Sequence, residues 1–275
     1  MNTQTGFRCI SVFSNSRQLV FIDLIAWQRL ELRNMHRDRK LQLIRRWFYP
    51  DTSTTRWLDI VNSYCHAGAE VCEIGSGSGK FPQNQNYPEV SSIFGIDLDT
   101  RVLTNPNLGD ARVGSADDLC ALVEGRKFDV IYSHMCAEHV ENPESFIRPQ
   151  LKCLKQDGMI IHSTVSKFYW TSMINRFVPR RIKAWLIREI ASGRTADDIF
   201  PAFYRLNSKA AIQSYSELFD IDFEIHRFDL PPGFLRRSLI LMLIFTGIHR
   251  PLQFLVPSIR PGFVFVLKRK RPVNG

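Results

Sequence analysis

The chain has 275 residues, of which 44% are hydrophobic and 23% are charged, and this ordinary globular mixture excludes a disordered or collagen-like chain. The formal net charge of +9 is uneven, because residues 1–50 hold nine Lys and Arg against three Asp and Glu, and residues 227–275 hold nine against one. The middle of the chain is therefore acidic, which excludes a uniformly basic nucleic-acid binder and indicates a catalytic or ligand-binding core with basic accessory segments.

Residues 1–52 are expected to form a basic helical extension, since 18–48 contain no Gly or Pro and many helix formers. Pro50 ends that helix. A second helix is expected over about 54–64, with Asp51 or a nearby hydroxyl as its cap.

A core over 53–165 alternates short apolar strands with helical segments, which is typical of a parallel βαβ sheet. A helix and two further strands continue this pattern in the C-terminal part, 208–275. The expected strands are 70–74, 92–96, 111–115, 128–133, 158–164, 223–228 and 262–268, and the expected later helices are 143–154 and 208–219.

Two segments interrupt the alternation. Residues 166–207 are rich in Arg and aromatic residues and are interpreted as a lid insertion. The segment 229–261 is far longer than a hairpin needs and contains the apolar run 238–248. That run is about half of the ~20 residues needed to cross a bilayer. His249, Arg250 and Pro251 then interrupt it, so a buried helix and an interfacial segment are the two alternatives.

The six cysteines include no C-x-x-C pair and no His/Cys spacing that suits zinc. This pattern indicates a reducing compartment without a disulfide framework. No compact basic region precedes an apolar run at the N-terminus, so no secretory signal is expected. The expected location is the cytoplasm, with peripheral membrane association as an option.

The segment that carries chemistry is VCEIGSGSG, residues 71–79, in which a strand runs into glycines at alternate positions. Glycine permits unusual backbone angles and close approach of a ligand, and Asp97 at the end of the next strand can accept hydrogen bonds from ribose hydroxyls. Lys80 stands where a dinucleotide fingerprint needs its third glycine, and no Ser or Thr follows it as a P-loop requires. A glycine-rich turn without a ligand is the remaining alternative.

The E-x-G-x-G-x-G spacing resembles motif I of the class I S-adenosylmethionine-dependent methyltransferases, of the small-molecule, type 11-like kind. Further segments that resemble the family follow in its order: IFGIDLD at 93–99, GSADDL at 114–119, FDVIYS at 128–133 with EHV at 138–140, LKQDG at 154–158 and FPAFYRLN at 200–207. The resemblance implies an α/β fold, a Rossmann-like seven-stranded and mostly parallel sheet with flanking helices and lid insertions.

The resemblance also implies S-adenosylmethionine as the cofactor. Asp97 then binds the ribose, whereas Ser115 stands where relatives often have Asp, so that Asp117 or the backbone of Ala116 takes over the adenine contact. Two prolines in 80–92 argue against the usual helix after the glycine-rich loop. The implied cofactor-binding residues are Glu73, Gly75, Ser76, Gly77, Gly79, Asp97, Leu98, Ser115, Ala116, Asp117 and Ser133.

Candidate catalytic residues follow the fourth strand, where open α/β sheets place their ligands. They are His134, Glu138 and His139. The alternative role for His134 is packing at the cofactor's edge, and for Glu138 and His139 it is the start of a helix. No metal is expected, because Met135 replaces the first acid of the E-x-x-E-H pattern of metal-binding relatives. His162, inside an apolar strand, is interpreted as a core histidine.

The implied reaction is in-line methyl transfer, and the basic, apolar insertions favour a small or lipid-like substrate at an anionic membrane surface. An ordinary lid with its Arg side chains in solvent is the alternative. An RNA methyltransferase is a second hypothesis, disfavoured because no N/D-P-P-Y/F-like motif follows the fourth strand. A non-catalytic, cofactor-binding assembly or regulatory protein is the third. The substrate, the accepting atom and the oligomeric state stay open.

Overall fold

The computed structural model describes Arg39, Gln42 and Val90 and the ranges 56–79, 92–177, 200–229 and 239–270. Most of the helix expected over 18–48 and most of the segment 80–92 therefore lie outside the described residues. So do the greater part of the lid insertion, 178–199, and the start of the C-terminal insertion, 230–238.

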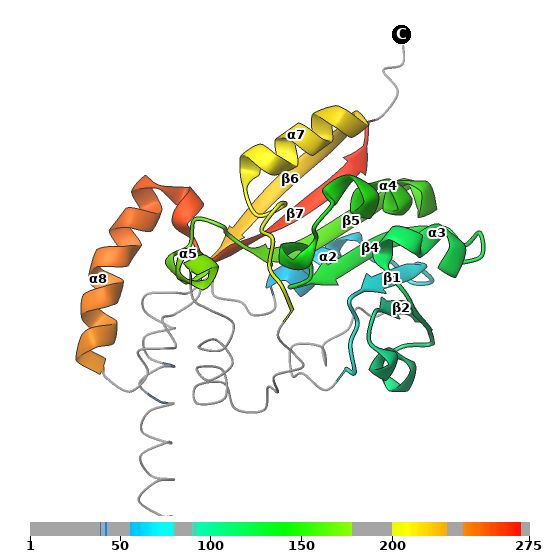
Figure 1. Ribbon diagram of the computed structural model, residues 1–275, viewed down its shortest axis with the longest axis horizontal. Coiled ribbons are helices and arrows are strands. Elements are labelled where there is room, and N and C mark those ends of the chain that lie inside the picture. Colours follow the sequence, from blue (N-terminus) through cyan, green and yellow to red (C-terminus); the bar gives the residue numbers. More distant parts are fainter. Residues whose placement is uncertain are drawn as a thin grey trace, which may run out of the picture.

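Seven strands form one sheet in the order β3-β2-β1-β4-β5-β7-β6. Strands β1 to β5 run parallel, and β7 is antiparallel to both β5 and β6, so the Rossmann-like, mostly parallel sheet is confirmed (Figure 1). The strands are β1 (Val71–Ile74), β2 (Ile93–Asp97), β3 (Asp110–Val113), β4 (Phe128–His134), β5 (Leu154–Val165), β6 (Ile221–Phe228) and β7 (Gly262–Arg269).

Helices cover both faces of the sheet. Helix α2 (Arg56–Tyr64) buries Trp57, Leu58 and Val61 against one face. On the other face α3 (Leu119–Leu122), α4 (Pro143–Cys153) and α7 (Lys209–Phe219) form a second core. The central strands are buried on both sides, which explains why they are short, continuous apolar runs instead of alternating ones.

Local sequence signals set the ends of α4 and α7. The Asn142 side chain accepts hydrogen bonds from the backbone N–H groups of Glu144 and Ser145, and Pro143 occupies the first turn of α4, where its missing N–H costs nothing. The Ser208 hydroxyl accepts from the N–H of Ala211 and caps α7. Short polar side chains thus satisfy N–H groups that a helix start leaves unpaired.

Two expected boundaries are wrong in an informative way. The fifth strand, expected over 158–164, begins at Leu154, because the LKQDG segment, which resembles a turn of the family, belongs to β5 itself. Between the pairs Phe128↔Leu154 and Val130↔Met159, β5 advances five residues while β4 advances two, so the expected turn is a bulge within the strand. The sixth strand also begins two residues earlier than expected, at Ile221, directly after the left-handed Asp220 that ends α7.

Helix α8 (Leu239–Leu255) occupies much of the C-terminal insertion and continues through His249, Arg250 and Pro251, which the sequence suggested would interrupt the apolar run. Figure 1 shows it beside α5 (Trp170–Phe177), to one side of the sheet. Ring contacts from Trp170 to Phe245 join the two helices. A short 3₁₀ turn, η7 (Pro257–Ile259), leads from α8 into β7. Within the described ranges, no helix has the length and apolarity to span a bilayer.

Two glycines provide a matched test of the packing at the end of β5. A Cβ on Gly262 would lie 2.6 Å from the carbonyl oxygen of Thr164 and 2.5 Å from the Phe228 ring, whereas one on Gly247 in α8 would meet nothing within 4 Å. We expect Gly262→Ala to lower the free energy of unfolding by about 1–3 kcal/mol. Gly247→Ala should raise it by about 0.5–1 kcal/mol, because alanine favours a helix interior. Urea denaturation measures both, and equal effects would contradict the packing described.

Candidate active site

The carboxyl ends of β1, β2 and β4 meet at one edge of the sheet, and the predicted site residues lie there. The N–H groups of Gly75 and Ser76 donate to the carbonyl oxygen of Ile96, at 2.8 and 3.2 Å, which joins the loop after β1 to the end of β2. This edge is where open α/β sheets bind ligands.

The glycine-rich loop depends on backbone angles that favour glycine. Gly75, Gly77 and Gly79 have φ of 76°, 53° and 67°. A Cβ on Gly79 would lie 2.2 Å from the side-chain oxygen of Asn105, and one on Gly75 would lie 3.2 Å from the Cys136 sulfur, but one on Gly77 would meet nothing within 4 Å. A side chain at Gly75 or Gly79 would therefore disturb the packing, whereas Gly77 has open space beside it.

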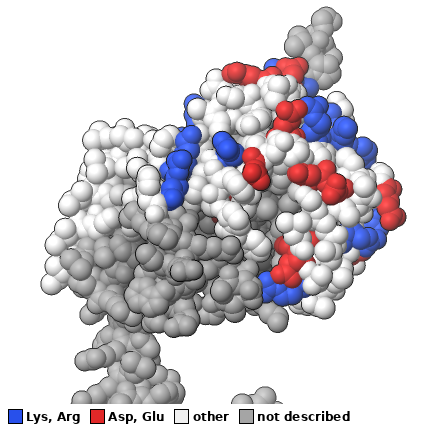
Figure 2. All heavy atoms as spheres, in the orientation of Figure 1, with Lys and Arg blue, Asp and Glu red and all other residues white. Residues whose placement is uncertain are grey.

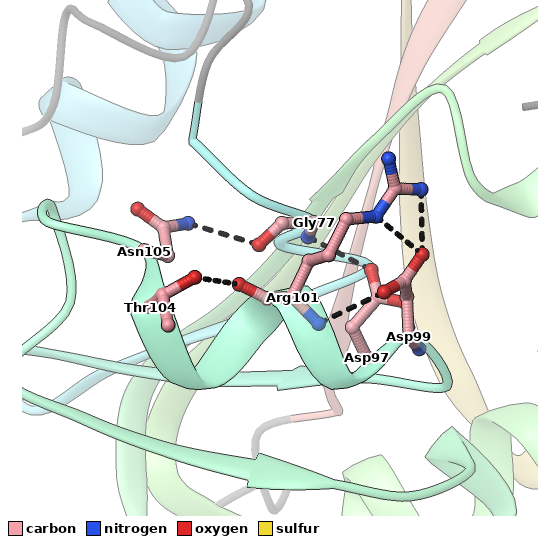
Figure 3. A network of polar contacts seen from close by, with 6 residues as sticks. All are labelled: Gly77, Asp97, Asp99, Arg101, Thr104 and Asn105. Carbon is pink, nitrogen blue, oxygen red and sulfur yellow. Dashed lines mark hydrogen bonds and ion pairs between the residues drawn. The ribbon is translucent and has the colours of Figure 1, made fainter. Parts of the chain in front are cut away.

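Asp97 holds this loop to β2 (Figure 3). Its two carboxylate oxygens accept hydrogen bonds from the N–H groups of Gly77 and Asp99, both at 2.8 Å. Asp99 turns away and pairs with Arg101, while the Asn105 side chain donates to the carbonyl oxygens of Ser76 and Gly77 at 3.1 and 3.3 Å. Each Asp97 oxygen keeps a further lone pair, so the carboxylate can still accept from ribose hydroxyls.

Glu73 is buried beneath the loop, only 3% exposed. Burial raises the pKa of its carboxyl group to about 8, although hydrogen bonds from Ser76 and Tyr132 act in the opposite direction. Its Oε2 atom has no hydrogen-bond partner among the described residues. A proton on Glu73, or a cationic ligand near it, would compensate for this burial.

The predicted adenine side lies on the neighbouring loop. Leu98 is 71% exposed directly after Asp97, an unusual position for a large apolar side chain and a suitable one for packing on a flat ring. Ser115 caps the 3₁₀ turn Ala116–Asp118, with its hydroxyl accepting from the N–H of Asp117. One oxygen of Asp117 accepts from the Ser145 hydroxyl at 2.9 Å, which leaves its other oxygen for a ligand.

Ser133 is buried within the sheet, and its hydroxyl lies 2.7 Å from Nδ1 of His162. Desolvation lowers the pKa of His162 to about 3, so its ring is neutral, and it packs between the rings of Phe146 and Phe265. This arrangement fits the interpretation of His162 as a core histidine. It leaves only the backbone of Ser133 for a cofactor, since the hydroxyl is already engaged.

His134 ends β4 and stacks on Trp57 of α2, with ring centroids 4.5 Å apart. Burial lowers the pKa of His134 to about 4, so its imidazole is neutral at pH 7. Its Nδ1 atom has no hydrogen-bond partner among the described residues. A neutral, positioned imidazole can accept a proton from a substrate.

Glu138 and His139 lie on a 3₁₀ turn, Ala137–His139, that precedes α4 by three residues, so they do not start that helix. Glu138 is 6% exposed and accepts from the Thr164 hydroxyl at 2.8 Å. Nδ1 of His139 lies 2.7 Å from the carbonyl oxygen of Pro201. Because a carbonyl only accepts, Nδ1 carries the hydrogen of this contact.

The described part of the lid insertion is tied to this turn. The N–H groups of Phe203 and Tyr204 donate to the backbone carbonyl of Glu138, at 2.8 and 3.1 Å. The Asn207 side chain donates to the Thr164 hydroxyl at 2.8 Å and so extends the chain of hydrogen bonds from Glu138. The backbone carbonyl of Glu138 therefore holds Phe203 and Tyr204, and its carboxylate is linked through Thr164 to Asn207.

These residues fit S-adenosylmethionine. Gly77 leaves space for a ligand, Asp97 has lone pairs that can accept from hydroxyls, Leu98 offers an apolar surface, and the unpartnered Oε2 atom of Glu73 lies below. Among the described residues, no group of three or more His, Cys, Asp or Glu side chains could hold a metal ion.

A sequence model described as a methyltransferase domain matches residues 35–202. The chain belongs to this methyltransferase family. The class I S-adenosylmethionine-dependent architecture expected from motif I is thereby confirmed, and S-adenosylmethionine is the cofactor of the family.

Curated relatives match a smaller part of the chain. A ubiquinone biosynthesis O-methyltransferase of Neisseria meningitidis is 27% identical over 146 residues, 46% of this chain and 61% of the relative. One of Ruegeria sp. is 25% identical over 126 residues, 43% of this chain and 44% of the relative. This methyltransferase therefore matches less than two thirds of the length of either one. A solved S-adenosylmethionine-dependent methyltransferase from Archaeoglobus fulgidus is 13% identical, covers 78% of this chain and 92% of its own, and has a TM-score of 0.48.

Sequence reasoning missed several residues on which the site depends. Asn105 and Asn107 hold the glycine-rich loop, Trp57 packs on His134, and Asn207 supports the Glu138 turn. Nothing in the sequence indicates that Asn105 and Asn107 pack against Gly79. No pattern in the sequence indicated that Asn207 contacts Thr164.

The raised pKa of Glu73 predicts how the stability of the methyltransferase depends on pH. The folded protein holds this proton up to about pH 8, and the unfolded chain releases it near 4.5, so the free energy of unfolding falls as pH rises through that range. The lowered pKa values of His134 and His162 act below 6.5. Between pH 6.5 and 8 the decline should therefore come from Glu73 and disappear in Glu73→Gln. Urea denaturation at both pH values measures it, with the exposed Glu141→Gln as control. A decline retained in Glu73→Gln would contradict the assignment.

Proposed function

We propose that the protein transfers a methyl group from S-adenosylmethionine to a small, lipid-like molecule at an anionic membrane surface. The observation that supports methyl transfer is the glycine-rich loop at the carboxyl edge of the sheet, which the hydrogen bond from Gly77 to Asp97 holds in place. Bound S-adenosylmethionine supplies a methyl group that its positive sulfur activates. The chain then has to align the acceptor and exclude water.

The candidate catalytic side chains divide into two roles in this proposal. His134 and His139 are the candidate proton acceptors, since the His134 ring is neutral and the Nδ1 atom of His139 is engaged by Pro201, which leaves its Nε2 atom for a substrate. Glu138 is a positioning residue, because its carboxylate is held by Thr164 and its backbone carbonyl holds Phe203 and Tyr204. A base adds rate only where the accepting atom must lose a proton.

Cofactor binding is tested with Asp97→Asn. The substitution removes the charge that accepts ribose hydroxyls, so the affinity for S-adenosylhomocysteine should fall by about 10- to 100-fold. The matched control is Asp99→Asn, two residues away, whose carboxylate binds Arg101 and should leave affinity within about twofold. Isothermal titration measures both. No binding by the native protein would favour a non-catalytic role.

Methyl transfer itself is tested by supplying labelled S-adenosylmethionine with lipid, quinone, saccharide and RNA extracts. Label in a lipid or quinone fraction, lost in Asp97→Asn, supports the proposal. Label in RNA alone would replace it with an RNA methyltransferase. The names of the curated relatives, which refer to O-methylation in ubiquinone biosynthesis, support the choice of small-molecule extracts.

Helix α8 supports the membrane part, because its apolar side faces outward. Thr246 and Gln253 are each 1% exposed, and Arg250 pairs with the buried Asp229. The outward side carries Ile240, Ile244, Ile248 and Leu252, at intervals of four residues, and Ile248 is 62% exposed. An apolar helix face of this kind suits a lipid surface, and the surplus of Lys and Arg in residues 227–275 favours an anionic one.

Vesicle flotation tests this surface. The native protein should float with vesicles that contain phosphatidylglycerol at low salt, and Ile248→Glu should reduce the floating fraction more than tenfold, since burying such a side chain contributes about 1.5–3 kcal/mol. Leu218→Glu is the control of equal charge, because Leu218 is 58% exposed on α7, away from α8. No flotation of the native protein would remove the membrane part and leave methyl transfer untouched.

A further inference from the structure

A small pocket of about 100 Å³ lies where the ends of β5 and β6 meet the start of α7. Arg227, Arg260 and Lys209 line it, together with the serines 166, 208 and 258. Among the residues that the structure describes, no carboxylate lines it. Three cations from three separate parts of the chain therefore converge on one recess.

Arg227 carries the argument. It projects from β6 on the side of Phe223 and Ile225, which pack on the core beneath α7. Within the described ranges, no Asp or Glu lies within ion-pair distance of its guanidinium. Burial and the nearby charge of Arg260 lower the pKa of Arg227, so the two cations repel each other in the absence of an anion.

Neighbouring charges do not neutralise the pocket. Asp229 is the nearest carboxylate, but it pairs with Arg250, and its Oδ1 atom lies 3.7 Å from Nε of Arg260. That nitrogen is buried without a hydrogen-bond partner among the described residues. One carboxylate is thus shared by two arginines, and Arg227 and Lys209 remain as a surplus of positive charge.

A second recess on the same protein shows the contrast. The open groove of about 450 Å³ at the start of β6 is lined by two lysines and three acidic residues. There Lys268 binds Glu224 at 2.8 Å, and Lys270 binds Asp220. The lysines of this groove therefore have acidic partners, unlike the cations that line the smaller pocket.

We propose that the Arg227–Arg260–Lys209 pocket binds the phosphate group of an anionic ligand. Guanidinium groups match the oxygens of phosphate with paired hydrogen bonds. The Ser166 hydroxyl already donates to the carbonyl oxygen of Ser258, so the hydroxyls of Ser208 and Ser258 are the further donors. The volume suits a tetrahedral oxyanion, since it equals roughly three water molecules at ~30 Å³ each. A phosphate placed there removes the repulsion between Arg227 and Arg260.

The position of the pocket is compatible with two sources of phosphate. Ser166 lines the pocket and lies two residues after Thr164, which binds Glu138. The pocket is therefore close to the candidate active site. Pro257 and Ser258 belong to η7, directly after α8, and Figure 2 shows Lys and Arg atoms beside the white surface that α8 presents. A soluble phosphorylated molecule and a phospholipid headgroup share the same chemistry here.

The first experiment compares thermal unfolding of the full chain in phosphate and in chloride at equal ionic strength. Phosphate should raise the melting temperature of the native protein by about 3 °C at a tenfold excess over its dissociation constant.

Arg227→Gln should lose this shift, and Arg227→Lys should keep part of it. Lys209→Gln, at an exposed position that tolerates substitution, should also reduce it. Lys152→Gln removes the same charge at the far end of α4 and should leave it unchanged.

The second experiment separates the sources with vesicles of phosphatidylglycerol or of phosphatidylcholine. Arg227-dependent binding to phosphatidylglycerol without a response to free phosphate assigns the pocket to a lipid headgroup, and the reverse assigns it to a soluble phosphate. The proposal is overturned if Arg227→Gln and Lys209→Gln both behave as the native protein in every arm, or if the native protein responds to neither probe. All readouts are binding, so they stay valid if no methyl transfer is found.

Discussion

The hydrogen bond from Gly77 to the Asp97 carboxylate is the contact on which the site depends. It joins the loop after β1 to the end of β2, so that two loops from different βα units form one surface. Asn105 completes the link from the following turn through the carbonyl oxygens of Ser76 and Gly77. Because Asp97 already accepts from backbone, the carboxylate is fixed in direction before a ligand arrives, and less conformational entropy is lost on binding.

Burial then decides the charge state of the groups around that surface. Glu73, His134 and His162 are all enclosed, and desolvation favours the neutral form of each one. A neutral Glu73 and a neutral His134 leave the candidate site without a buried cation that would repel the sulfonium of the cofactor. The acidic middle of the chain is thus less charged in its interior than its composition suggests.

The sequence was sufficient to predict features that follow a regular pattern. Apolar runs that end in chemically distinctive residues indicated the succession of strands along the chain, the glycine-rich loop and Asp97. It was insufficient where distant segments meet: nothing in the sequence pairs Asn207 with Thr164, or Trp57 with His134. Pro251 was misleading for a related reason, since a proline ends an isolated helix, but α8 continues through it while packed against α5.

The orientation of α8 links the remaining observations. Taking Arg250 and Asp229 out of water is costly, and a buried pair rarely stabilises a fold more than apolar residues would. What such a pair does provide is direction: with Arg250, Thr246 and Gln253 turned inward, the isoleucines of α8 have to face outward. In water that orientation exposes apolar surface without any gain. Against a lipid surface the same orientation would be favourable, and the proposed phosphate pocket adjoins η7, the turn that directly follows α8.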